Sequence, residues 1–298
     1  MPDHALTATG LRKGFGKKQA VEHVDLSVPA GSIYGVLGPN GAGKTTTLRM
    51  LLGIIEPDAG ERTVLGAAHP RQVAHRIGYL PEERGLYPAM KASDAIGFMG
   101  ALRGLNWREG RRRGAEMLQA AGLGEAADAK VRTLSKGMAQ FVQLVGAMVH
   151  RPDLLVLDEP FSGLDPVNQE RLEALILGER DRGATILFST HIMAHAQRLC
   201  DRLAVIAGGQ RRFEGSVDDA RALLPMRAHL VPRQGDARTL LPADARKEGE
   251  GFAFDVPPDG IEPVLKRLIE SGNGVAGLSV ERPALHDVFV KLVREADA

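Results

Sequence analysis

At residues 38–45 the chain reads Gly38-Pro39-Asn40-Gly41-Ala42-Gly43-Lys44-Thr45, which fits the phosphate-binding pattern Gly-x4-Gly-Lys-Ser/Thr. An apolar run at 33–37 precedes this stretch and an apolar segment at 48–52 follows it, so we expect a strand, a loop and a helix in that order. Such glycines let consecutive backbone N–H groups point inward at the positive end of a helix, where the Lys44 ammonium can reach terminal phosphates. The Thr45 hydroxyl would ligate Mg²⁺. The stretch predicts a nucleotide-binding α/β fold rather than a structural glycine turn.

The composition is that of an ordinary globular protein. Its 298 residues could form one large domain, or one large and one small, and 44% hydrophobic residues suffice for a packed core. Lys and Arg number 38 against 37 Asp and Glu, so no overall positive field suggests nucleic acid as a partner, and none is expected. The single cysteine, Cys200, rules out an intramolecular disulfide and a multi-cysteine metal site, which fits a reducing cytoplasm.

Neither a secretory leader nor a membrane span is expected. The first residues lack the basic and then apolar order of a signal peptide, and no apolar run approaches the roughly 18 residues that cross a bilayer.

The first 80 residues predict two kinds of sheet. Residues 6–28 alternate in short strand-like pieces, and residues 21–28 show a two-residue apolar period, which indicates an antiparallel β-layer. Phe15 lies at a turn of this layer, where it could stack on a purine base, although local sequence favours a hydrophobic residue that closes the turn. Residues 76–80 predict a strand that ends in a charged loop containing Glu82 and Glu83. That loop could be part of a site or a solvated turn.

Residues 91–147 have helical periodicity, with Ile96, Met99 and Leu102 expected on one face, and they indicate an inserted helical subdomain at about 88–147. The basic run at 108–113 is expected to be a solvated helix face rather than a lipid or nucleic-acid patch. Near the end of this block Ser135 and Gly137 stand just before a helix. Its unpaired N–H groups would make a second anion site.

The continuous apolar run at 154–157 predicts a fully buried parallel strand that delivers two carboxylates, Asp158 and Glu159, at its carboxyl end. Buried charge there requires a cation, so Asp158 is predicted to hold Mg²⁺ and Glu159 to orient and polarise an attacking water. A helix-capping role is the alternative, and Pro160 disfavours it. Another buried strand at 184–189 ends near His191, which could contact a phosphate, cap a helix or simply lie at the surface.

The character of the chain changes after residue 215. A hairpin is expected at Gly208-Gly209, and beyond it prolines punctuate short segments without catalytic residue patterns. Strands are predicted near 228–231, 252–256 and 275–280, and helices near 261–271 and 284–294. These segments suggest a small α+β domain at 216–298 behind a larger one at 1–215.

Together these separated elements resemble the ATP-binding subunit of ATP-binding cassette (ABC) transporters. On this resemblance residues 38–46, ending at Thr46, correspond to the Walker A loop, residues 155–159 to Walker B and residues 162–165 to the D-loop. Residues 134–138 correspond to the signature motif, in which Ser135 and Gly137 contact the γ-phosphate, His191 to the switch histidine and Phe15 to the adenine-stacking aromatic. The resemblance covers about residues 4–215 and implies a cassette with a mixed sheet core, an antiparallel β-layer and the inserted helical subdomain.

Two departures narrow the resemblance. Glu82 stands where the family usually has a glutamine, and although a carboxylate can still coordinate Mg²⁺ or its water, the usual glutamine contacts are in doubt. The signature reads Leu-Ser-Lys-Gly-Met instead of Leu-Ser-Gly-Gly-Gln, with Ser135 and Gly137 kept. Both departures, the wording of residues 79–88 and the C-terminal domain are similar to the ABC-2-type branch, which includes sodium and drug efflux ATPases.

The resemblance implies an ATPase that works with Mg²⁺ as a head-to-tail homodimer. Ser135 and Gly137 of one cassette would cover the ATP held by Lys44 and Thr45 of the other, and hydrolysis would use Glu159 and His191. The expected partner is a separate transmembrane permease, gripped by the helical subdomain and the Glu82 loop at the cytoplasmic face of the cell membrane. Export is the expected direction, and the cargo is not legible in this chain.

Two other classes are less favoured. A soluble ABC ATPase that acts on DNA or ribosomes typically has a long coiled coil or two cassettes, and this chain shows neither a sustained heptad repeat nor a second phosphate loop. A GTPase would need Asn-Lys-x-Asp, which is absent, and a small-molecule kinase would not explain the signature together with His191.

Overall fold

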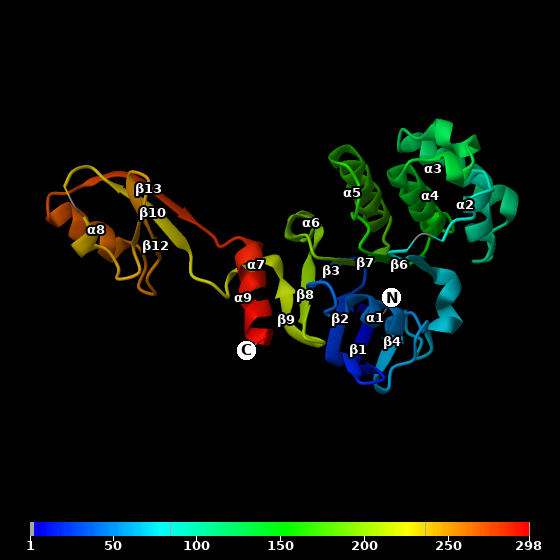
Figure 1. Ribbon diagram of the computed structural model, residues 1–298, viewed down its shortest axis with the longest axis horizontal. Coiled ribbons are helices and arrows are strands. Elements are labelled where there is room, and N and C mark those ends of the chain that lie inside the picture. Colours follow the sequence, from blue (N-terminus) through cyan, green and yellow to red (C-terminus); the bar gives the residue numbers. More distant parts are fainter. Residues whose placement is uncertain (1–2, 84, 236, 298) are drawn as a thin grey trace. The chain divides into compact units, whose positions relative to one another are not determined.

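The computed structural model describes residues 3–83, 85–235 and 237–297 (Figure 1). The chain forms two compact units, one of Met1–Val217 together with Leu292–Ala298, and one of Asp218–Lys291. The domain boundary expected after residue 215 lies two residues earlier than this division, and the expectation did not include the return of the last residues to the first unit.

A nine-stranded sheet organises the first unit, in the order β4-β1-β2-β9-β8-β3-β7-β6-β5. The strands are β1 His4–Phe15, β2 Lys18–Pro29, β3 Ile33–Leu37, β4 Ala59–Val64, β5 Ile77–Leu80, β6 Leu154–Asp158, β7 Thr185–Thr190, β8 Arg202–Ala207 and β9 Gln210–Ser216. Strands β5, β6, β7, β3 and β8 are parallel, whereas β1 pairs antiparallel with both β2 and β4. The sheet is mixed, as expected, and β8 and β9 form the predicted antiparallel hairpin.

Helices cover both faces of the parallel strands. Alternate residues of β6 face opposite sides: Leu154 and Val156 pack in one hydrophobic cluster with α1 (Lys44–Leu51), whereas Leu155 and Leu157 pack in the other. The second cluster also contains residues of α4 (Lys136–Met148) and α5 (Pro166–Asp181). Because both faces are covered, these strands are apolar without interruption, which is why the sequence revealed them.

The parallel arrangement places several loops at one edge of the sheet. Strands β3, β5, β6 and β7 run in the same direction, so their carboxyl ends lie together. The phosphate loop, the Glu82 loop, the Asp158-Glu159 pair and His191 all follow directly after these four ends. The topology therefore gathers residues that are more than 100 positions apart in the chain.

The inserted subdomain contains α2 (Ala92–Ala101), α3 (Trp107–Ala120), the 3-10 helices Gly124–Asp128 and Val131–Thr133, and α4. Ile96 is fully buried in its core, but Leu102, expected on the same face, is 68% exposed because the helix ends there. The basic run on α3 is largely exposed and paired with carboxylates, as expected for a solvated face. Its guanidinium groups at Arg112 and Arg113 lower the pKa of Glu109 to about 2.

The remaining helices of the first unit are short. The 3-10 helix Pro70–Arg76 precedes β5, and α6 (Met193–Leu199) follows β7. Strand β4 was not predicted; it forms by pairing with β1, for example Leu6 with Val64. No helix within the described part of the chain is both long and apolar enough to span a membrane.

The second unit is an α+β domain, as expected. Its four strands are antiparallel in the order β11-β12-β10-β13. They are β10 Arg227–Pro232, β11 Arg246–Glu248, β12 Gly251–Asp255 and β13 Val275–Glu281, accompanied by α7 Val217–Arg221, the 3-10 helix Arg238–Leu240 and α8 Glu262–Glu270. The helix α9 Leu285–Asp297 begins in this unit, and its residues from Leu292 on belong to the first. Leu230, Phe254 and Leu268 pack in its core. Strand β11 was not predicted, because all three of its residues are charged and exposed.

Glycines allow α2 and α3 to approach each other closely. A Cβ added at Gly114 would lie 2.4 Å from Cγ2 and 3.0 Å from Cβ of Ile96, which is fully buried. We expect Gly114→Ala to lower the free energy of unfolding by roughly 1–3 kcal/mol, because the added methyl overfills this contact. Urea unfolding of the purified chain measures the change.

The matched control is Gly178→Ala. Gly178 lies on an exposed turn of α5, and an added Cβ would meet nothing within 4 Å. There the better helix propensity of alanine should raise stability by roughly 0.5–1 kcal/mol. Equal shifts of the same sign in the two variants would contradict the close packing of α2 on α3.

Candidate functional site

The phosphate loop lies directly on the backbone of two strands, β2 and β8. A Cβ at Gly43, whose φ is 100°, would lie 2.4 Å from the Ala20 carbonyl oxygen of β2. A Cβ at Gly38 would lie 2.3 Å from the Ile206 carbonyl oxygen of β8. Only glycine fits at these positions. The loop is thereby held against the sheet while α1 begins at Lys44, so the unpaired N–H groups of the first helical turn lie at the same place.

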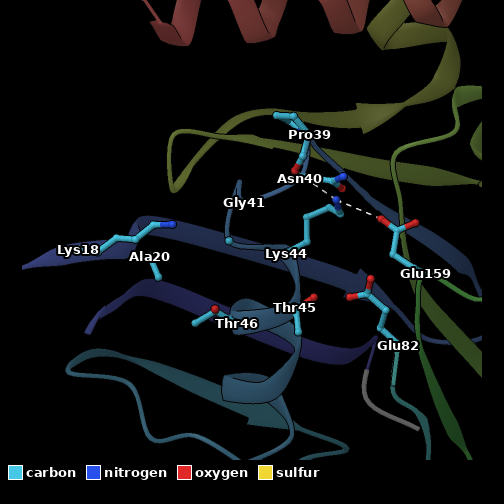
Figure 2. Close-up of a pocket in the computed structure, with 11 residues that line it drawn as sticks. Lys18, Ala20, Pro39, Asn40, Gly41, Lys44, Thr45, Thr46, Glu82 and Glu159 are labelled. Atoms are coloured by element: carbon cyan, nitrogen blue, oxygen red, sulfur yellow. Dashed lines mark hydrogen bonds and ion pairs between the residues drawn. The ribbon is translucent and has the colours of Figure 1, made fainter. Parts of the chain in front are cut away.

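Lys44 is the buried cation of the site. Its side chain is 6% exposed, and its Nζ donates hydrogen bonds to the carbonyl oxygens of Gly38 (2.7 Å) and Pro39 (3.3 Å). The same ammonium lies 3.1 Å from Oε1 of Glu159, whose side chain is 8% exposed (Figure 2). Because both partners are buried, removing either one would leave an uncompensated charge, which typically costs about 3–5 kcal/mol.

Asp158 is fully buried at the end of β6. Its Oδ1 accepts hydrogen bonds from the hydroxyls of Ser189 (2.6 Å) and Thr45 (3.2 Å). Its Oδ2 is also buried, and among the described residues nothing donates a hydrogen bond to it. A buried carboxylate oxygen without a donor, beside a hydroxyl, matches the hard oxygen ligands that Mg²⁺ prefers.

Glu159 adopts an unusual backbone conformation. Its φ is 48°, in the left-handed region that costs a non-glycine residue about 1–3 kcal/mol. Its N–H donates to the Ser189 hydroxyl at 2.9 Å, so Ser189 contacts both acidic residues. Oε2 of Glu159 lies 3.0 Å from Nδ1 of His191. Because an ionised carboxylate only accepts, the His191 hydrogen is on Nδ1.

A pocket of about 280 Å³ opens over the phosphate loop. The residues that line it are Lys18, Ala20, Pro39, Asn40, Gly41, Gly43, Lys44, Thr45, Thr46, Glu82 and Glu159 (Figure 2). Glu82 reaches the pocket from the loop after β5, and Gln143 of α4 holds the next residue of that loop by donating to the Glu83 carbonyl at 3.2 Å. The structure thus brings together predicted residues from two strand ends and the phosphate loop.

Seven predicted residues are absent from the described lining of this pocket: Gly38 and Ala42 of the loop, Asp158 and His191, which contact Thr45 and Glu159, and then Phe15, Ser135 and Gly137. Phe15 is 50% exposed at the end of β1, with the Lys13 ammonium 5.7 Å from its ring centre. Ser135 caps α4 by accepting a hydrogen bond from the Met138 N–H at 3.2 Å, and Gly137 follows it on the first turn. The roles of these last three in binding ATP stay predictions.

Sequence reasoning missed Lys18, Ala20 and Ser189. Lys18 and Ala20 lie on β2, and their place in the pocket depends on how closely the loop sits on that strand, which no pattern reveals. Ser189 is the second-last residue of β7, one strand over from Asp158. A hydroxyl at the end of a buried apolar strand was the available signal.

Comparison with known proteins agrees with this geometry. The model of the family described as ABC transporter matches residues 21–162. An ABC transporter ATP-binding protein, YhaQ of Bacillus subtilis (strain 168), is 34% identical over 292 residues, which cover 97% of this chain and 98% of the relative. The solved structure of an ATP binding subunit of an ABC transporter superposes with a TM-score of 0.68 at 32% identity, covering 74% of this chain and 92% of that one.

Two relatives carry names that refer to resistance or export. The daunorubicin/doxorubicin resistance ATP-binding protein DrrA of Streptomyces peucetius is 33% identical, with 98% of this chain and 93% of the relative covered. A Nod factor export ATP-binding protein I of Ralstonia nicotianae is 38% identical, with 96% and 93% covered. These relatives agree with the expected ABC-2-type branch. The identification made from the motifs is confirmed: the chain belongs to the family of ABC transporter ATP-binding proteins.

Proposed function

We propose that this chain is the ATP-hydrolysing motor subunit of an exporter, working with a separate transmembrane permease at the cytoplasmic face of the membrane. The observation that carries the proposal is that Lys44, Thr45 and Glu159 line one pocket, with Asp158 buried behind them and bonded to Thr45. The family implies ATPase activity, and this is the residue set that phosphoryl transfer to water needs.

Binding would begin at the phosphate loop. Its N–H groups and the Lys44 ammonium present positive charge to the phosphates of ATP. In the described structure that ammonium is shared with Glu159 at 3.1 Å, so the phosphates compete with the carboxylate for the same cation. We infer that ATP binding draws Lys44 away from Glu159. Oε1 of Glu159 is then free to accept a hydrogen bond from the attacking water.

The metal site would use the oxygens beside Lys44. Thr45, Asp158 and Glu82 are the residues proposed to hold Mg²⁺, supported by the unpartnered Oδ2 of Asp158 and by the place of Glu82 in the pocket lining. When bound with the nucleotide, Mg²⁺ supplies positive charge that stabilises the phosphate oxygens. Such a site needs few protein ligands, since phosphates and water complete the coordination.

A homodimer would complete the site. Ser135 and Gly137 lie at the start of α4 and apart from the described lining of their own pocket, so a second copy turned head to tail is needed to bring such a helix start onto the nucleotide. ATP would then hold two copies together, and hydrolysis would release them. The difference in contacts between the two states is what can move a partner.

The partner is proposed from the relatives. Two of them are named as ATP-binding proteins of drug resistance and of export, and no helix in the described ranges of this chain can cross a membrane by itself. The permease would be gripped by the helical subdomain and the Glu82 loop, and it would select the cargo. No nucleic acid is expected as a partner.

The test is purification of the tagged chain from gently solubilised membranes, with identification of the co-purified proteins and measurement of the ATPase rate with and without them. We expect a protein with several membrane spans that changes the rate. Recovery of ribosomes or DNA with no membrane protein would instead support a soluble ABC ATPase.

Glu159→Gln should keep ATP affinity within a few-fold and lower turnover roughly 100-fold or more, because an amide cannot act as the base that accepts a proton from water. The variant should accumulate as an ATP-bound dimer, measured by light scattering after size-exclusion chromatography. Glu170→Gln, an exposed carboxylate on α5, is the control and should behave as wild type. A Glu159→Gln chain that stays monomeric at saturating ATP would contradict the head-to-tail mechanism.

Ser189→Ala removes the hydroxyl that contacts Asp158 and the Glu159 N–H. Losing these two buried hydrogen bonds should reduce turnover about tenfold, corresponding to 1–2 kcal/mol, and should raise the Mg²⁺ concentration needed for half-maximal rate. Ser32→Ala is the control, because the Ser32 hydroxyl donates to the Pro29 carbonyl just before β3, at the end of that strand away from the site. Unchanged Mg²⁺ dependence in Ser189→Ala would argue against Asp158 as a metal ligand.

A further inference from the structure

Two histidines that follow β7 contact the chain at the end of β6. His191 follows β7, and its Nδ1 lies 3.0 Å from Oε2 of Glu159. Four residues later, on α6, the ring of His195 stacks on the ring of Phe161, with centres 3.9 Å apart and planes inclined by 7°. Phe161 is two residues after Glu159. The chain segments 159–161 and 191–195 therefore touch at two points.

His195 is held firmly where it lies. It is 3% exposed, and its Nδ1 donates to Oε1 of Glu173 on α5 at 3.1 Å. Arg198, one turn further along α6, donates to the same carboxylate oxygen. Because the ionised carboxylate only accepts, it fixes both the tautomer and the plane of the His195 ring. An apolar side chain could fill this volume without an acidic partner, so packing alone does not require histidine here.

Phe161 connects His195 to the acidic residues at the end of β6. Phe161 also packs edge-to-face on Phe188 of β7, with ring centres 6.0 Å apart, so its ring lies between α6 and β7. Pro160, whose φ is restricted, connects Phe161 to Glu159, and its carbonyl is fixed by Gln140 of α4 at 2.7 Å. A shift of Phe161 would therefore be transmitted to Glu159.

The left-handed backbone of Glu159 makes this support necessary. A φ of 48° at a non-glycine residue persists only where surrounding contacts hold it. Ser189 holds the N–H of Glu159, and the stacked rings hold the chain two residues beyond it. His191 and His195 lie on the same continuous segment, so the stack also sets where His191 stands.

We propose that His195, stacked on Phe161 and anchored by Glu173, is a positioning residue that sets the His191–Glu159 contact for hydrolysis. It is not among the residues that line the pocket over the phosphate loop, and it acts through Phe161 and through the segment that carries His191. This inference rests on the proposed ATPase function, and it adds a residue that the chain's motifs do not identify.

The experiment compares His195→Ala and His195→Phe with wild type, measuring kcat, ATP affinity and the urea midpoint. His195→Ala should lower kcat roughly 10- to 100-fold, because small displacements of reacting groups are costly, and should leave ATP affinity within about twofold. His195→Phe keeps a flat ring against Phe161 and should recover most of that loss. Glu173→Gln, which keeps the shape and weakens the anchor, should fall between the two. His69→Ala, at an exposed histidine, is the matched control and should retain wild-type kcat.

The decisive arm is a double-variant cycle measured by single-turnover hydrolysis. If His195 sets the His191–Glu159 contact, the loss caused by His195→Ala should be clearly smaller in a His191→Ala background than in wild type, because that background already lacks the contact. Fully additive losses, or a His195→Ala chain with wild-type kcat, would overturn the proposal. A wild-type chain without ATPase activity would instead refute the proposed function, so the two failures are distinguishable.

Discussion

The buried pair of Lys44 and Glu159 is the interaction on which the site depends. One charge comes from the loop after β3 and the other from the end of β6, and their side chains meet at 3.1 Å with almost no solvent exposure. Neither charge could be buried alone, so the loop and the strand end must keep their relative positions.

The sheet makes this meeting possible. Parallel strands place their carboxyl ends at one edge, and helices on both faces bury the strands completely. Backbone carbonyls of β2 and β8 then press against Gly43 and Gly38, which leaves the phosphate loop little freedom to move. The stacked rings of Phe161 and His195 are a further example of packing that holds a segment in place, here just beyond the strand ends. Position in this site comes from packing around the reactive groups as much as from those groups themselves.

Most of the larger elements could be predicted, because their signals are local. Continuous apolar runs revealed the parallel strands and an alternating run revealed β1 and β2, whereas β4 and β11 were missed because they form by pairing with distant strands. Leu102 was misplaced because the periodicity continued past the end of α2. In the site, Lys44, Asp158 and Glu159 stand in motifs that chemistry makes recognisable. Lys18, Ala20 and Ser189 have no such motif and were found only by proximity.

The amino-acid sequence by itself determined the family, the order of the elements and the chemical types available for phosphate and metal binding. These properties can be recognised from short patterns. In such a pattern, the chemistry of phosphate or metal binding requires the backbone freedom of a glycine or the charge of a lysine or a carboxylate. Only the tertiary structure decided that Ser189 contacts both acidic residues, that Glu159 is left-handed and that His195 lies on Phe161. Each of these facts depends on contacts between chain segments about 30 residues apart, and no local propensity encodes which side chains a folded sheet brings face to face.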